Sequence, residues 1–210
     1  MMGSMMPGLH VGVLALQGGV AEHLEILNRI PGVTARKVLD AQQLSRVEGL
    51  IIPGGESSAV GTLLDGDERG RALKKAILER ITDGMPVWGT CMGAIMLARY
   101  IENDGRTHLS VMDMTVRRNA YGSQLDSFTA LEEITGIDGA AFPLVFIRAP
   151  VIVSVGPDVE VLARIGDSIV ACRQGNCLAS TFHPELTSDP RFHGYFMRMV
   201  AEYAEVPQPQ

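Results

Sequence analysis

The segment Gly89-Thr90-Cys91-Met92-Gly93 places a cysteine between small residues, where an apolar run at 86–89 meets a helical pattern at 92–101. A nucleophile elbow needs this arrangement, because its turn is so tight that close neighbours of the nucleophile must be small. The turn would carry Cys91 over the sheet edge at the start of a helix, where free N–H groups and the helix dipole favour a thiolate. We expect Cys91 to be a nucleophile; the alternative is a buried, unreactive cysteine.

A thiolate nucleophile needs a base and a group that orients the base, and Phe182-His183-Pro184-Glu185 offers both. Pro184 favours an extended backbone at His183, and in an extended chain positions i and i+2 face the same side. We expect Glu185 to accept a hydrogen bond from one imidazole nitrogen while the other faces Cys91, as in a catalytic triad. Alone, the segment is also typical of a surface histidine beside a solvated glutamate.

A third segment, Pro53-Gly54-Gly55-Glu56-Ser57, directly follows an apolar run. Two glycines there let the backbone point N–H groups into a cavity. Acyl transfer needs two such donors for the oxyanion, and losing one raises the barrier by about 3–4 kcal/mol. We expect the amides of Gly55 and Met92 to form this oxyanion hole. The alternatives are an ordinary turn and a phosphate-binding loop, and the segment lacks the Lys-Ser/Thr ending of the latter.

The elements that must position these residues alternate between strand-like and helical patterns in the first half of the chain. This alternation predicts a parallel sheet covered on both faces by helices, followed by a more antiparallel portion. We expect strands at 9–16, 33–39, 49–52 and 86–89 and helices at 20–30, 71–81 and 92–101. Further strands are expected at 112–116, 144–147, 151–155, 159–164, 168–173 and 178–182, with a last helix capped by Asp189 and Pro190.

The bulk properties predict one globular domain at residues 9–204, preceded by a flexible extension at 1–8 and followed by a disordered tail at 205–210. The net charge is −6 and the basic residues are scattered, which disfavours nucleic-acid binding. The chain contains no run of 18 apolar residues, so we expect no membrane-spanning helix. Three cysteines do not make a disulfide framework, so we expect a reducing cytoplasm.

The remaining cysteines and histidines show no metal-ligand spacing, and we expect neither a metal nor a cofactor. Cys172 and Cys177 form a lone C-x4-C pair that is more typical of thiols packed between strands. His23, in the first expected helix, has two interpretations: a contact with a partner, or a member of a local network.

The order of a GG turn, G-T-C-x-G and H-P-E resembles the class I, or triad, glutamine amidotransferases. Longer blocks resemble one branch of them, the glutaminase subunits of pyridoxal 5′-phosphate synthase, and these blocks span residues 13 to 196. They are LALQG at 14–18, Glu22-His23, PGGES at 53–57, RNAYG at 118–122, DSF at 126–128, FIRAP at 146–150, Arg173-Gln174 and FHPELT at 182–187.

The resemblance implies a three-layer, flavodoxin-like α/β fold with a mostly parallel central sheet and added antiparallel strands. It implies hydrolysis of L-glutamine to glutamate and ammonia through a thioester on Cys91. It also implies substrate-binding roles for Gly55, Glu56, Ser57, Arg118, Ile147 and Arg148. Such roles suit free glutamine, since an arginine can hold the α-carboxylate in a fork and a glutamate can face the α-ammonium.

The resemblance further implies a partner, which is a synthase subunit that uses the ammonia to make pyridoxal 5′-phosphate. The two subunits would form a large hetero-oligomer, and the free glutaminase would be weak until it docks.

Two departures from the family pattern are Met92, where alanine is usual, and Ser58, where threonine is usual. Three alternatives remain open: a glutaminase subunit of another amidotransferase, a non-catalytic scaffold or sensor, and a hydrolase of γ-glutamyl peptides.

Overall fold

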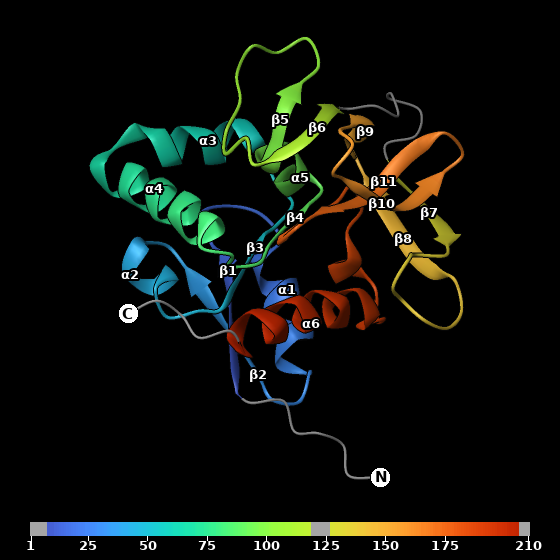
Figure 1. The fold of residues 1–210 in the computed structure, drawn as a ribbon, viewed down its shortest axis with the longest axis horizontal. Coiled ribbons are helices and arrows are strands. Elements are labelled where there is room, and N and C mark those ends of the chain that lie inside the picture. The colour runs from blue at the N-terminus through green and yellow to red at the C-terminus, as the bar shows by residue number, and fades with distance from the viewer. Residues whose placement is uncertain (1–7, 119–126, 206–210) are drawn as a thin grey trace.

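A mixed sheet runs through the centre of the computed structural model, which describes residues 8–118 and 127–205 (Figure 1). Within this part of the chain the sheet has ten strands, in the order β2-β1-β3-β4-β12-β11-β9-β6-β5 with β10 beside β11, and β7 and β8 form a separate pair. The strands are β1 (Leu9–Leu14), β2 (Val33–Val38), β3 (Gly49–Ile52), β4 (Val87–Thr90), β5 (Ala98–Ile101), β6 (Met112–Arg117), β7 (Ser127–Glu132), β8 (Phe142–Ile147), β9 (Val151–Val155), β10 (Glu160–Ile165), β11 (Ser168–Gln174) and β12 (Cys177–Ser180).

The sheet changes character along its width, as the sequence pattern predicts. β2, β1, β3, β4 and β12 are parallel neighbours, whereas β11 pairs antiparallel with β12, β9 and β10. The inner parallel strands β3, β4 and β12 are buried throughout, because both of their faces are covered. The flavodoxin-like α/β architecture with added antiparallel strands is therefore confirmed.

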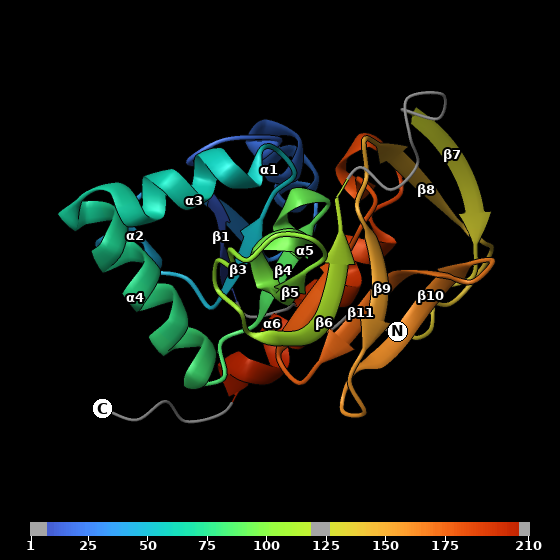
Figure 2. The same ribbon diagram turned by 90° about the horizontal axis from the view of Figure 1, so that it is seen from above.

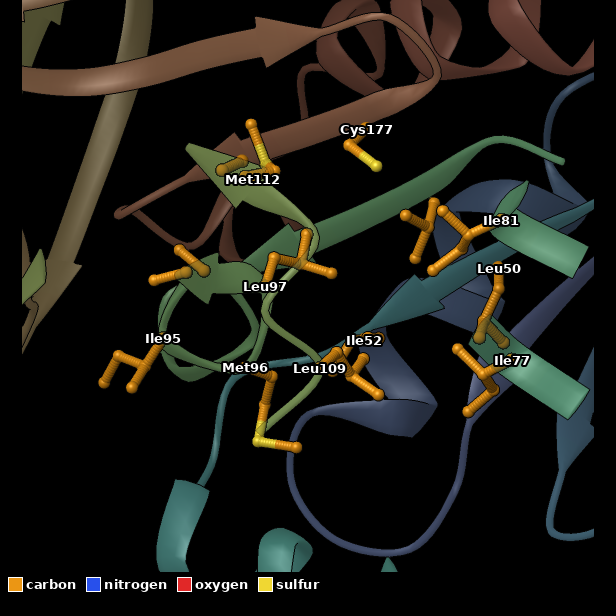
Figure 3. Close-up of a cluster of buried hydrophobic side chains, with 14 of the residues drawn as sticks. Leu50, Ile52, Ile77, Ile81, Ile95, Met96, Leu97, Leu109, Met112 and Cys177 are labelled. Carbon is orange, nitrogen blue, oxygen red and sulfur yellow. The ribbon is translucent and has the colours of Figure 1, made fainter. Parts of the chain in front are cut away.

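Helices cover the two faces of the sheet and bury separate apolar clusters (Figure 2). On one face α2 (Ala41–Leu44), α3 (Ser57–Gly66), α4 (Glu68–Thr82) and α5 (Met92–Leu97) pack on alternate strand residues such as Leu50 and Ile52. Figure 3 shows Leu50 beside Ile77 and Ile81 of α4. On the other face α1 (Val20–Asn28) and α6 (Arg191–Glu205) pack on Ile51 and Trp88, together with the β7–β8 pair. Among the described residues, no helix has the length and apolarity that a bilayer crossing demands.

The parallel strands bring the predicted chemistry to one edge of the sheet. β3, β4 and β12 are hydrogen-bonded neighbours with the same direction, so their carboxyl ends lie side by side. The segments that follow these ends are Pro53–Ser57, Cys91 and Thr181–Glu185. The loop after β1 joins them, since the N–H of Gly19 donates to the carbonyl of Gly54 at 3.0 Å.

Two expectations about local structure are wrong. The helix expected at 92–101 ends at Leu97, and Ala98–Ile101 is instead the edge strand β5, which pairs parallel with β6. Sheet pairing supplies hydrogen bonds that local helical periodicity cannot reveal. The chain after His183 is also not extended, because Pro184–Leu186 forms a 3-10 turn, η1.

Smaller outcomes concern the ends of elements and of the chain. The strand expected at 178–182 ends at Ser180, which leaves Thr181 and Phe182 to lead into the turn that carries His183. The last helix follows the predicted cap, since Asp189 Oδ1 accepts from the N–H of Arg191 at 3.0 Å. The extension expected at 1–8 and the tail expected at 205–210 fall almost wholly outside the described residues.

Candidate active site

Cys91 lies in a strained turn between β4 and α5. Its φ and ψ are 49° and −107°, a region that a residue with a side chain rarely adopts and that costs about 1–3 kcal/mol. The turn is held because the N–H of Cys91 donates to the carbonyl of Ser180, the last residue of β12, at 2.7 Å. This is the elbow geometry that the sequence predicts, and Cys91 precedes the first turn of α5.

The glycines on either side of Cys91 are required by close backbone contacts. A Cβ on Gly89 would lie 2.3 Å from the carbonyl oxygen of Gly93, and one on Gly93 would lie 2.1 Å from that of Ile52. Neither contact can be relieved by a side-chain rotation, because backbone atoms cause both. The small residues therefore let β4, α5 and β3 approach closely enough to form the elbow.

His183 and Glu185 form the predicted pair, although by a different backbone path. Nδ1 of His183 lies 2.7 Å from Oε1 of Glu185, and the 3-10 turn beginning at Pro184 brings the carboxylate back under the ring. The N–H of His183 donates to the carbonyl of Val145 in β8 at 2.7 Å, which fixes the backbone. The Glu185 side chain is 1% exposed, so its charge faces the imidazole and not solvent.

Cys91 and His183 meet beside Gly54. The point where a Cβ on Gly54 would stand is 2.5 Å from Cε1 of His183 and 3.3 Å from Cβ of Cys91. Burial alone would lower the pKa of His183, but hydrogen bonds to Cys91 and Glu185, with their charges, raise it to about 10. A protonated imidazole between a thiolate and a carboxylate is the charge distribution that this pKa favours.

Two backbone N–H groups beside Cys91 are available to a ligand. Those of Gly55 and Met92 donate to no other group within residues 8–118 and 127–205. The neighbouring N–H of Glu56 is engaged, because it donates to Oε1 of Gln17 at 2.6 Å. Both predicted donors are therefore unpaired in the described part of the chain.

A cavity of about 400 Å³ opens in front of Cys91. It gathers seven of the residues singled out from the sequence, and adds Ile95 and Pro150, which sequence reasoning missed. Its lining is Gly55, Glu56, Ser57, Cys91, Met92, Ile95, Arg118, Arg148 and Pro150. Ile147 contributes its carbonyl oxygen, 3.9 Å from Sγ of Cys91, while its side chain is 40% exposed.

Charged groups of the cavity are held by the start of α3. Arg118 donates to Oγ of Ser57 at 2.8 Å and to Oγ of Ser58 at 3.4 Å. Glu56 caps α3, since its carboxylate accepts from the N–H of Ser58 at 3.3 Å. A cation and an anion thus border one small cavity, and the rest of the RNAYG block, 119–122, lies outside the described residues.

The structure adds a residue whose role the sequence left open. His23 is fully buried, which rules out the partner-contact interpretation and supports the local-network one. Its Nε2 lies 3.4 Å from Oε2 of Glu185 and 3.3 Å from Oγ1 of Thr90. The Glu22-His23 pair of the family resemblance was the signal that could have indicated this position.

The other cysteines have no part in the site. Cys172 and Cys177 are buried in the sheet, and burial raises the pKa of both thiols to about 12. No cluster of three or more His, Cys, Asp or Glu side chains fit to hold a metal ion occurs in the described ranges. The expected strand-packing role of these two cysteines is confirmed.

Comparison with known sequences gives one consistent result. The profile of the SNO glutamine amidotransferase family matches residues 13–202. The pyridoxal 5′-phosphate synthase subunit PdxT of Ruminiclostridium cellulolyticum is 51% identical over 190 residues, which cover 90% of this chain and 98% of that protein. The subunit of the same name from Clostridium botulinum is 47% identical over 189 residues, covering 90% and 96%.

Solved structures agree with the sequence relatives. A crystal structure of a glutamine amidotransferase superimposes with a TM-score of 0.83 at 45% identity, covering 90% of this chain and 98% of the other. A glutamine amidotransferase of Thermotoga maritima shares the fold at 13% identity, with a TM-score of 0.58 and coverage of 95% and 87%. By its fold, its elbow cysteine and its relatives, the chain belongs to the SNO glutamine amidotransferase family.

Proposed function

We propose that this chain is the glutaminase subunit of a pyridoxal 5′-phosphate synthase, which hydrolyses L-glutamine and supplies the ammonia to a synthase subunit. The observation that carries the glutaminase step is the meeting of Cys91, His183 and Glu185 behind a cavity with charged groups of both signs. The 51% identity to a PdxT subunit over 90% of the chain supports the pathway.

The reaction begins with attack of the Cys91 thiolate on the side-chain amide carbon of glutamine. A C–S bond forms, the C–N bond breaks, and the imidazolium of His183 gives its proton to the departing ammonia. His183 then removes a proton from water, which attacks the thioester and releases glutamate and the thiolate. The raised pKa of His183 supports the first step, because the imidazole holds the proton that the leaving group needs.

The tetrahedral intermediates carry a negative oxygen that needs donors fixed in advance. The N–H groups of Gly55 and Met92 serve as the oxyanion hole, and their unpaired state beside Cys91 supports this role. The side chain of Met92 is buried against the core, 2% exposed, so the usual alanine can be replaced without loss of the backbone donor.

Charged side chains of the cavity hold the amino-acid end of glutamine. Arg118 binds the α-carboxylate as a planar fork, and Glu56 faces the α-ammonium. Ser57 holds Arg118 in place, and the carbonyl of Ile147 with Arg148 closes the opposite wall. These assignments follow from charge and from position in one cavity.

The ammonia acceptor is a synthase subunit, and the two chains form a large hetero-oligomer in the cytoplasm. Neither nucleic acid nor a membrane takes part. The overall negative charge of −6 and the scattered basic residues support the exclusion of nucleic acid.

The test measures ammonia release from glutamine by the chain alone and with a pyridoxal 5′-phosphate synthase subunit. We expect weak hydrolysis alone, strong stimulation by the synthase, and no activity in Cys91→Ala. Stimulation only by a different synthase would favour the role of a glutaminase for another amidotransferase. A folded wild type that is inactive with every partner would favour a scaffold.

A further inference from the structure

The buried His23 lies at the back of the candidate triad, on the far side of Glu185 from His183. Oε1 of Glu185 contacts Nδ1 of His183 at 2.7 Å, and Oε2 faces Nε2 of His23 at 3.4 Å. Among the described residues Oε2 has no hydrogen-bond partner in this arrangement, although the side chain is 1% exposed. A buried carboxylate oxygen without a donor is costly, so the protonation of the nearby Nε2 of His23 matters.

A second buried histidine determines which nitrogen of His23 carries the proton. Nδ1 of His23 lies 2.9 Å from Nε2 of His193, so one of these two atoms is the donor and the other the acceptor. If His23 donated through Nδ1, its bare Nε2 would face a carboxylate, and the buried Nδ1 of His193 would hold an unpaired N–H. If His193 donates through Nε2 instead, an N–H of His23 is available to the carboxylate, and the unpaired atom of His193 is a bare nitrogen and not an N–H. The electrostatics therefore favour the Nε2–H tautomer of His23.

We propose that His23 is a positioning residue of the glutaminase reaction, whose Nε2–H holds the second oxygen of Glu185 while His193 fixes the required tautomer. This inference rests on the proposed function. It describes a chain of hydrogen bonds that runs from His193 through His23, Glu185 and His183 towards Cys91. His23 acts through Glu185 and does not line the substrate cavity.

The surroundings keep the two buried histidines in one charge state. Burial, followed by the nearby His193 and His183, holds the pKa of His23 well below its ordinary value, and burial lowers the pKa of His193 to about 3. Glu22 is the other charged group nearby, and its carboxylate lies across Gly19 from that of Glu185. Both buried histidines are thus neutral near pH 7.

Neighbouring aromatic and hydroxyl groups hold the two rings in place. Trp88 packs edge-on against His23, with ring centres 5.6 Å apart, and against His193 at 5.0 Å. Oγ1 of Thr90, the residue before Cys91, also lies within hydrogen-bonding distance of Nε2 of His23, at 3.3 Å. The last residue of β4 therefore supports the carboxylate that orients the base and leads directly into the nucleophile.

The test compares His23→Leu, His23→Gln and His193→Phe with the wild type, each in complex with the synthase subunit. The glutamine side chain places an N–H where Nε2 of histidine lies, whereas leucine has none. We expect His23→Leu to lower kcat by about 10- to 100-fold with KM for glutamine unchanged, and His23→Gln to recover much of the loss. We expect a smaller loss in His193→Phe, which leaves the tautomer of His23 free.

The pH profile separates positioning from packing. Loss of the donor loosens the hold of Glu185 on His183, so the acid limb of kcat/KM, which reports the Cys91–His183 pair, moves in His23→Leu and returns towards the wild-type limb in His23→Gln. A folded His23→Leu with wild-type kcat and an unmoved acid limb would overturn the proposal, as would equal losses in both variants without a shift. If His23→Leu does not fold, kcat and the acid limb of kcat/KM in His193→Phe test the proposal instead.

Alkylation of Cys91 by iodoacetamide keeps this test distinct from that of the proposed function. The pH dependence of alkylation reports the Cys91–His183 pair without any glutamine turnover. If the wild type released no ammonia, the proposed function would fail, while the alkylation profiles of the same variants would still support or contradict the role of His23.

Discussion

Nδ1 of His183 and Oε1 of Glu185 lie 2.7 Å apart across a single 3-10 turn, not along a strand. The turn directs both side chains into the protein, where the carboxylate is almost wholly buried. The turn therefore lets one carboxylate face two imidazoles.

Replacing Glu185 with glutamine should impair the chemistry far more than substrate binding. The amide has the same shape, but its NH2 group favours the wrong tautomer of His183 and removes the charge that favours the imidazolium. We expect kcat to fall by on the order of 10⁴-fold with little change in KM. Steady-state ammonia release measures both, and Glu25→Gln, at an exposed ion pair on α1, is the matched control that should retain full activity.

Much of the candidate site could be predicted because its requirements are local. The elbow needs small residues next to Cys91, and the H-P-E order brings a base and its partner within a few positions. The burial of His23 could not be predicted, because its neighbours Thr90, Glu185 and His193 come from distant parts of the chain.

The same distinction between local and tertiary requirements explains which elements of the fold could be predicted. The apolar runs of β1, β3 and β4 predict parallel strands from composition alone. The edge strand β5 continues a helical pattern from α5, and only its pairing with β6, the next strand along the chain, makes it a strand. The 3-10 turn after His183 also depends on tertiary contacts, since β8 holds the backbone of His183.

Gly54→Ala should disrupt the site without unfolding the protein. The added Cβ would stand 2.5 Å from Cε1 of His183, so the ring must move away from Cys91. A displacement of about 1 Å in a catalytic group lowers the rate by about 100-fold, and we expect kcat to fall by this order. Ammonia release and the melting temperature should be measured together.

The control for this change is Gly66→Ala at the end of α3, where nothing lies within 4 Å of the added Cβ. It should leave activity unchanged and keep or slightly raise stability. Wild-type kcat in a folded Gly54→Ala would show that Cys91 and His183 do not need their present separation.

Alkylation of the folded protein should be confined to one cysteine. Cys172 and Cys177 are buried, and burial raises their pKa to about 12, so neither supplies a thiolate near neutral pH. We expect peptide mass spectrometry after brief iodoacetamide treatment to find label on Cys91 alone. Prior incubation with a glutamine-mimicking electrophile should block that label. Equal labelling of Cys172 would contradict the burial of the sheet thiols.

Arg118→Lys should weaken glutamine binding and leave the chemical step intact. Lysine keeps the charge but loses the planar fork, and a charge-assisted hydrogen bond contributes about 1.5–3 kcal/mol. We expect KM to rise by about 10- to 100-fold while kcat stays within a few-fold. Arg106→Lys, at an exposed ion pair with Asp104, is the control. An unchanged KM in Arg118→Lys would remove the arginine from the binding role.

Acid should destabilise the protein through its buried histidines. The pKa of His193 is lowered from 6.5 to about 3, so below pH 6.5 the unfolded chain takes up a proton that the folded chain refuses. Stability then falls as pH falls, by about 1.4 kcal/mol per pH unit for each such histidine. His183 contributes the opposite slope above pH 6.5, because its raised pKa keeps it protonated in the folded state alone, and it adds no slope well below that pH, where both states are protonated.

Urea unfolding of the wild type and His193→Phe between about pH 7.5 and pH 5 measures this contribution. The variant should lose less stability on acidification than the wild type, since its phenylalanine takes up no proton. Parallel losses in the two proteins would mean that His193 is not a buried neutral group.

The most direct test of the account is a search for the thioester on Cys91. The complex with the synthase subunit is mixed with glutamine, quenched in acid during turnover, and digested for mass spectrometry. The account predicts a γ-glutamyl adduct on the peptide that contains Cys91, and its absence from Cys91→Ala, which should also release no ammonia. Hydrolysis of glutamine by Cys91→Ala at the wild-type rate would contradict it.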